Sequence, residues 1–181
     1  MTRTGNQRLV LIGFPALLVG AVVCILWWPD FVPQASPGNE SFPSLFGKGA
    51  TCPQPRASER AAQRLERAAR LHVERYPYDP EDGVRAAHLF MQSADCYRAV
   101  GAEAEVRRVE AVIKTLRLQI ETDYASARLV LDRALRLGRW EIVDRELHRL
   151  LGMTRHLPEG TYARWLRETA GRAAAHARLP R

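Results

Sequence analysis

The apolar residues of this chain fall into two patterns, one continuous and one periodic. Residues 9–28 form a run of twenty residues without a charged side chain. Because an α-helix rises about 1.5 Å per residue, this run predicts a helix of roughly 30 Å, which matches the hydrocarbon thickness of a bilayer. We therefore expect a transmembrane helix at residues 9–28, preceded by a short N-terminus at residues 1–8.

From residue 58 onward, apolar or small residues recur every three or four positions, which is typical of amphipathic helices. The pattern predicts six helices, over residues 58–76, 80–100, 102–120, 124–138, 140–152 and 159–177. The turn between the third and fourth rests on Thr122 and Asp123 as cap residues, and one continuous helix is the alternative there. No stretch alternates as a half-buried strand does. Residues 56–178 are therefore predicted to form an all-α domain of about six antiparallel helices, followed by a tail at residues 179–181.

The strongest local signals for helix ends lie near residue 79. Ser58 is a candidate N-cap for the first helix, and Pro77 ends that helix. Asp79 is a candidate N-cap for the second helix, and Pro80 suits its first position. Asp82 would place a carboxylate in the first turn of that helix.

Residues 29–55 differ in composition from both neighbours, because Pro, Ser, Gly, Asn and Gln dominate them. Six prolines in this stretch favour an extended backbone, so we expect a flexible, Pro-rich linker. Phe42, Leu45 and Phe46 are the exception. Their segment could dock on the domain, lie in the membrane interface or bind a partner, and docking is the favoured interpretation.

The charges that flank the apolar run predict its orientation. Arg3 and Arg8 precede the run without an acid, whereas Asp30 and Glu40 follow it. By the positive-inside rule, the N-terminus stays in the cytoplasm and the domain is exported. Trp27 and Trp28 would lie at the outer membrane–water interface. Arginine greatly outnumbers lysine, which favours a bacterial source and therefore a bacterial inner membrane with the domain in the periplasm. A cleaved signal peptide, or a lipid on Cys24, would attach the domain differently.

The charge and the motifs indicate no particular chemistry. The chain carries a net charge of +7, but acids and bases alternate along the predicted helices, as on a solvated surface. Its histidines and cysteines lack the spacing of a zinc site, and neither a glycine-rich phosphate loop nor a nucleophile elbow occurs. We therefore predict no catalytic or metal-binding residue, no cofactor and no nucleic-acid partner.

The predicted export of the domain indicates which cysteines could form a disulfide. With Cys24 in the membrane, two thiols reach the periplasm, Cys52 in the linker and Cys96 in the second predicted helix. Disulfides persist in oxidising compartments. Cys52 and Cys96 are therefore a candidate disulfide, with two separate thiols as the alternative.

The predicted domain contains a weak internal repeat. Residues 86–116 and 123–151 align with an offset of 37 residues, so that Gly101 and Gly138 coincide. In the second copy, Gly138 and Trp140 fall at the turn, and Leu131, Val143 and Leu147 fall on helix-packing positions. In this respect the chain resembles tetratricopeptide repeat proteins, whose helical hairpins repeat about every 34 residues. The resemblance implies stacked hairpins and a protein-binding scaffold, with another antiparallel helical array as the alternative.

The leading functional hypothesis is thus a membrane-anchored, periplasm-facing scaffold or adaptor for protein partners in the cell envelope. The alternative is an envelope enzyme or a carbohydrate-binding module. It would use Trp140, Tyr162, Trp165 and nearby acids, provided that the aromatic rings line an open cleft.

Overall fold

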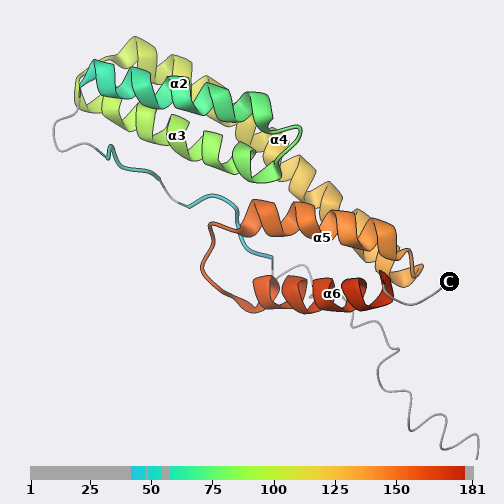
Figure 1. Cartoon of the computed structure of the whole chain (residues 1–181). Helices are drawn as coiled ribbons and strands as arrows, with labels where there is room; N and C mark the ends of the chain where they lie inside the picture. The colour runs from blue at the N-terminus through green and yellow to red at the C-terminus, as the bar shows by residue number, and fades with distance from the viewer. Residues whose placement is uncertain (1–41, 48, 54–57, 178–181) are drawn as a thin grey trace, which may run out of the picture. The chain divides into compact units, whose positions relative to one another are not determined.

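A computed structural model describes residues 42–47, 49–53 and 58–177. All regular secondary structure in these ranges is α-helical, so the predicted all-α class is confirmed for them (Figure 1). The helices are α2 (Glu59–Arg75), α3 (Pro80–Ala99), α4 (Glu103–Arg136), α5 (Trp140–Thr154) and α6 (Thr161–Ala177).

The predicted turn at Thr122 and Asp123 is wrong, because α4 runs through both residues and is 34 residues long. The Thr122 hydroxyl donates to the carbonyl of Leu118 within the helix, at 2.8 Å, instead of capping a new one. Ile120 and Tyr124 are both buried, so the apolar stripe continues across the expected break. The described part of the chain therefore has five helices where six were expected.

Each helix packs against the next one along the chain, and α3 also contacts α5. Near its N-terminus α4 is bonded to α2, where Arg108 pairs with Glu66 at 2.7 Å. Further along, Arg149 of α5 pairs with Asp123 of α4 at 3.3 Å. One helix therefore serves both predicted hairpins, and Figure 1 shows α4 extending from α2 and α3 to α5. The buried apolar side chains of the described residues form one continuous core.

Two glycines end helices in the same way. Gly101 and Gly138 have φ angles of 73° and 62°, in the left-handed region that glycine tolerates. Each is followed by a residue whose N–H bonds a carbonyl five residues back, Ala102 to Tyr97 and Arg139 to Ala134. These two turns share one backbone geometry.

The predicted N-caps of the first two helices are confirmed. The Ser58 side chain accepts a hydrogen bond from the Ala61 N–H at 3.2 Å, and that of Asp79 accepts one from the Glu81 N–H at 3.0 Å. Pro80 is the first residue of α3, where its missing N–H costs no helical bond.

Among the described residues, no helix combines the length and the hydropathy needed to cross a membrane. The span predicted at residues 9–28 lies outside them, together with residues 1–8, Trp27 and Trp28, the first part of the linker and the tail at 179–181. For these segments the sequence-based expectations stay predictions.

Candidate functional site

Residues 42–47 and 49–53 lie along the helices and form, with them, the first candidate site. We call the surface under them the docking groove. It is defined by the side chains that contact the segment, which are His88, Asp95 and Cys96 of α3, Arg117 and Arg128 of α4, His156 after α5, and Tyr162 of α6.

Apolar burial holds the first half of this segment in the docking groove. Leu45 is 3 % exposed and Phe46 is 5 % exposed, and both belong to the main core. Burying side chains of this size contributes about 1.5–3 kcal/mol each. Residues 42–47, the exception within the linker predicted at residues 29–55, dock on the domain, as the favoured interpretation of that segment expected.

Arginines cover the aromatic rings of the docked segment. The guanidinium carbon of Arg128 lies 4.0 Å from the Phe42 ring centre, and that of Arg117 lies 4.7 Å from the Phe46 ring centre. The Phe42 ring also meets the Tyr162 ring edge-on, with centres 5.1 Å apart. These cation–π and edge-to-face contacts add to the stabilisation that burial of the apolar side chains provides.

Two candidate cysteines come together at the other end of the docked segment. The structure joins Cys52 and Cys96 in a disulfide, with their Cα atoms 4.9 Å apart. The backbone N–H of Cys52 donates to the carboxylate of Asp95 at 2.9 Å. The segment is therefore attached covalently to α3 as well as by packing.

Two histidines lie beneath the docked segment. The Nε2 of His156 donates to the carbonyl of Leu45 at 2.8 Å, because a carbonyl oxygen can only accept. The rings of His156 and His88 meet at 5.4 Å between centres, and Nε2 of His88 is buried without a described partner. Burial, followed by the nearby charges of His156 and Arg117, lowers the pKa of His88 below its usual value.

The second candidate site is a cleft of about 630 Å³ that we call the turn cleft. Three parts of the chain line it: the turn between α2 and α3, the middle of α4, and one face of α5. The lining residues are Tyr76, Pro77, Tyr78, Pro80, Gln119, Asp123, Arg145, Glu146, His148 and Arg149.

Hydrogen bonds inside the turn cleft join its walls. The Tyr76 hydroxyl donates to Asp123 at 2.6 Å, and Arg149 approaches the other oxygen of that carboxylate at 3.3 Å. Burial, together with the hydrogen bond to Asp123, raises the pKa of Tyr76 well above its usual value. A Cβ on Gly83 would lie 2.3 Å from the Tyr76 ring, so glycine is what lets the ring pack against α3.

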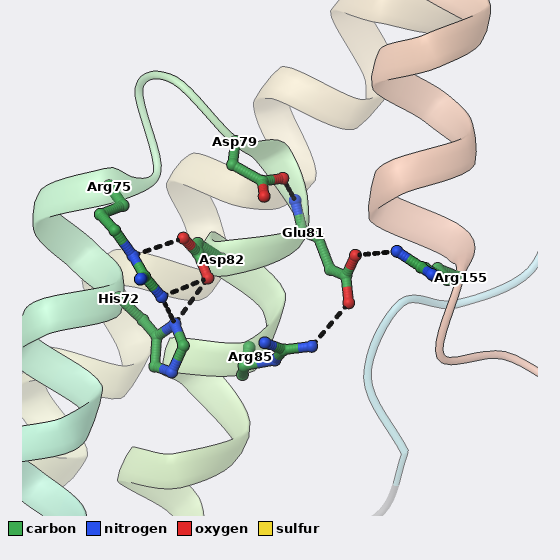
Figure 2. Close-up of polar contacts among 7 residues, drawn as sticks. All are labelled: His72, Arg75, Asp79, Glu81, Asp82, Arg85 and Arg155. Carbon is green, nitrogen blue, oxygen red and sulfur yellow. Dashed lines mark hydrogen bonds and ion pairs between the residues drawn. The ribbon is translucent and has the colours of Figure 1, made fainter.

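Ion pairs fix the turn that carries Tyr76 and Tyr78 (Figure 2). Asp82 is buried and accepts from His72 at 2.6 Å, and the Nε of Arg75 lies 2.8 Å from its other oxygen. Burial raises the pKa of Asp82, but the hydrogen bonds from His72 and Arg75 outweigh burial, so the net direction is downward. This carboxylate therefore joins α2 to α3 from within the first turn of α3.

On the other side of the same turn, α3 is tied to the end of α5. Figure 2 shows the Glu81 side chain between Arg85, at 2.7 Å, and Arg155, at 3.0 Å. The turn is held from both sides, so it can serve as a rigid wall of the turn cleft.

The aromatic residues of the alternative hypothesis, Trp140, Tyr162 and Trp165, do not together line an open cleft. Trp165 and Tyr162 are buried and stack on each other with centres 5.9 Å apart. Trp140, which follows the Gly138 turn, stacks on His176 at 3.9 Å. A carbohydrate-binding or catalytic cleft would need open ring faces at these positions, so the structure lends that alternative no support.

The turn cleft was missed by the sequence-based predictions because its residues come from three distant segments. Asp123 was interpreted as a helix cap, yet it bonds Tyr76 across the fold. The one available signal was Tyr78, an aromatic residue between two prolines in a turn. Among the described residues, no three His, Cys, Asp or Glu side chains come together as metal ligands.

Comparisons of this chain with family models, with curated proteins and with solved structures returned no match.

Proposed function

We propose that this chain is a membrane-anchored helical adaptor that faces the periplasm of a bacterium and binds protein partners of an envelope complex. The predicted apolar helix at residues 9–28 would anchor it, and the five helices would form the binding module. In this proposal the resemblance to tetratricopeptide repeats is limited to the shared glycine turns, because α4 is common to both copies.

The observation that carries the proposal is the docked segment with its Cys52–Cys96 pairing. A disulfide supports an oxidising compartment, which agrees with the orientation expected from Arg3 and Arg8. Because residues 42–47 and 49–53 dock on the helices, the proposed tether would comprise residues 29–41. At no more than about 3.6 Å per residue, that tether reaches at most about 50 Å. The helices would therefore act close to the membrane surface.

Membrane topology gives the first test of the proposal. Alkaline phosphatase and green fluorescent protein are fused in parallel to the C-terminus of the full chain. We expect phosphatase activity and no fluorescence. Alkaline phosphatase forms the disulfides that it needs only in an oxidising compartment, whereas green fluorescent protein that is exported as an unfolded chain does not become fluorescent there. A fluorescent, phosphatase-inactive pair would overturn the periplasmic location.

Partner binding gives the second test. A photoreactive amino acid replaces Tyr78 in the turn cleft, or Leu129 on the outer face of α4, in the full chain expressed at its native level. Both positions are strongly exposed, so neither replacement disturbs the core. We expect a discrete cross-linked partner from Tyr78 that also captures this chain in the reciprocal experiment. If neither position gives a cross-linked product, the result would count against the adaptor proposal.

A further inference from the structure

Helix α4 carries a second periodic face on the side that points away from the core. Leu116, Ile120 and Tyr124 are among the buried positions of this helix. About half a helical turn away from them, six uncharged residues recur at alternating spacings of four and three, and none of them is buried. Helices pair in coiled coils through residues with these spacings. We call these residues the outer stripe: Ala111, Thr115, Leu118, Thr122, Ala125 and Leu129.

The outer stripe is apolar, and the described part of the chain leaves it largely open to solvent. Leu118 is 66 % exposed and Leu129 is 72 % exposed. The hydroxyls of Thr115 and Thr122 donate to the carbonyls of Ala111 and Leu118 within α4, at 3.2 Å and 2.8 Å. These hydroxyls therefore need no partner from another molecule, and the threonine methyl groups remain for packing.

Two charged residues beside the outer stripe indicate what fits it. Lys114 and Glu121 lie one heptad apart along the same edge of the stripe, and both are exposed. The carboxylate of Glu121 approaches Arg117 at 3.7 Å, a long ion pair that leaves its side chain 52 % exposed. A helix that packs on the stripe must therefore bring an acid to Lys114 and a base to Glu121.

A second copy of α4 meets this requirement when the two helices run antiparallel. A two-fold axis relates the copies, so a contact between two different residues occurs twice. Lys114 of each copy then lies beside Glu121 of the other copy, which gives two pairs of opposite charge. In a parallel pair, residues five positions apart would meet across the edges of the stripe, so that Lys114 would face Gln119 and Glu121 would face Ser126. The charges therefore favour the antiparallel pair.

The same arrangement also fits the sizes of the side chains. When Lys114 and Glu121 are paired, the two-fold axis passes close to Leu118, which faces Thr115 of the second copy. Ala111 likewise faces Thr122 of the second copy. Leucine thus meets a smaller side chain across the axis, so the two helices can approach closely.

We propose that two copies of this chain pair through the outer stripes of their α4 helices, in an antiparallel arrangement that sets Lys114 of each copy beside Glu121 of the other. The occupant of this helix face is therefore a second copy of the same chain. The inference goes beyond the adaptor function and does not depend on it, because it rests on α4 alone.

Reversing the two charges tests the pairing. Two versions of the full chain with different affinity tags are co-expressed, purified in detergent through one tag, and probed for the other tag. Lys114→Glu sets acid against acid, and Glu121→Lys sets base against base. Each variant should therefore capture itself about tenfold less than the unaltered chain does. A mixture of the two variants sets acid beside base again and should recover the capture of the unaltered chain.

A leucine in the outer stripe provides a second test with a matched control. Leu118→Glu places a charge inside the apolar contact and should abolish capture. Leu71 lies on α2, away from the stripe, and is exposed to a similar extent, at 61 %. Leu71→Glu should therefore leave capture unchanged. The charge variants keep the inference testable if Leu118→Glu fails to fold, because Lys114 and Glu121 lie on the surface.

Three outcomes would overturn the inference. The unaltered chain could capture no second copy, the mixed charge variants could fail to recover capture, or all variants could capture a second copy equally, which would assign the pairing to another surface. Photocross-linking separates this inference from the adaptor proposal. A product of two copies from Leu129, which belongs to the outer stripe, supports the pairing alone. A different protein captured from Tyr78 supports the adaptor alone.

Discussion

The docking groove and the turn cleft lie on the same five helices, and what occupies each of them differs. Buried side chains of the chain itself, Leu45 and Phe46, fill the docking groove, and the Cys52–Cys96 disulfide holds them there. The turn cleft is an open space of about 630 Å³, and an exposed tyrosine, Tyr78, lines it.

The difference separates surfaces that stabilise the fold from surfaces available to other molecules. A groove that is already covered by apolar side chains of its own chain gives its binding energy to folding. A polar cleft with rigid walls keeps its binding energy for a ligand, at a small cost in stability. Substitutions in the docking groove should therefore change the free energy of unfolding more than substitutions in the turn cleft.

The largest expected effect comes from removing the disulfide. Cys52 and Cys96 are separated by 44 residues, and closing a loop of this length stabilises a fold by about 4 kcal/mol in the chain-entropy model. The double variant Cys52→Ala/Cys96→Ala should lose about that much free energy of unfolding in urea. The unaltered protein under reducing conditions is the control and should lose a similar amount. Alkylation of both Cys52 and Cys96 in the non-reduced protein would contradict the pairing.

Aromatic residues in the two regions give the next test. Phe46→Ala should cost about 3 kcal/mol of unfolding free energy, because it removes a buried ring and leaves a cavity under Arg117. Tyr78→Ala is its counterpart in the turn cleft and should change stability by no more than about 0.5 kcal/mol. Urea denaturation of both variants measures the contrast, and equal losses would remove the distinction between the two regions.

A smaller loss is expected from the hydrogen bond inside the turn cleft. Tyr76→Phe keeps the ring on Gly83 and removes the hydroxyl that donates to Asp123, which should cost about 1–2 kcal/mol in urea denaturation. Tyr78→Phe removes an exposed hydroxyl and serves as the control. If Tyr76→Phe loses no more unfolding free energy than Tyr78→Phe, the ion pair with Arg149 is sufficient for Asp123 and the hydrogen bond from Tyr76 adds nothing to stability.

The helices could be predicted from sequence because their signals are local. Ser58, Asp79 and Pro80 act within one helical turn, and the glycines at 101 and 138 end helices through their own backbone conformation. The error at Thr122 and Asp123 has the same origin. Both residue types favour caps, but a buried stripe from Ile120 to Tyr124 stabilises continuous helix by tertiary packing, and a local pattern does not report such packing.

The two sites differ in how far the sequence could predict them. Docking of residues 42–47 could be anticipated, because apolar residues in a polar linker need a surface to cover them. The turn cleft could not, because its chemistry depends on Tyr76, Asp123 and Glu146 meeting across three helices. A carboxylate on an arginine-rich helix is usually an ordinary surface ion pair, so only the burial of Glu146 identifies it as unusual.

The smallest expected effect is a pH dependence confined to the docking groove. Burial beside His156 and Arg117 lowers the pKa of His88 in the folded state, so the unfolded chain binds the proton more readily. Stability is therefore complete above the unfolded pKa of about 6.5 and is lost as the pH falls from there through the folded pKa. The guanidinium of Arg117 and the buried surroundings disfavour protonation of His88 in place, so the segment that carries Leu45 and Phe46 should exchange its amide hydrogens faster at pH 5.5 than at pH 7.5.

The pH effect can be assigned to one residue. His88→Gln removes this titrating group and should reduce the loss of stability between pH 7.5 and 5.5. Glu66 does not interfere in this window, because hydrogen bonds from Arg108 and Arg70, which outweigh its burial, lower its pKa to about 2, and its contribution is lost only as the pH falls below about 4.5. Exchange at Tyr76 and Tyr78 in the turn cleft should not change with His88→Gln. A similar pH response in both regions would mean that they open together, and the contrast between a closed groove and an independent cleft would then be wrong.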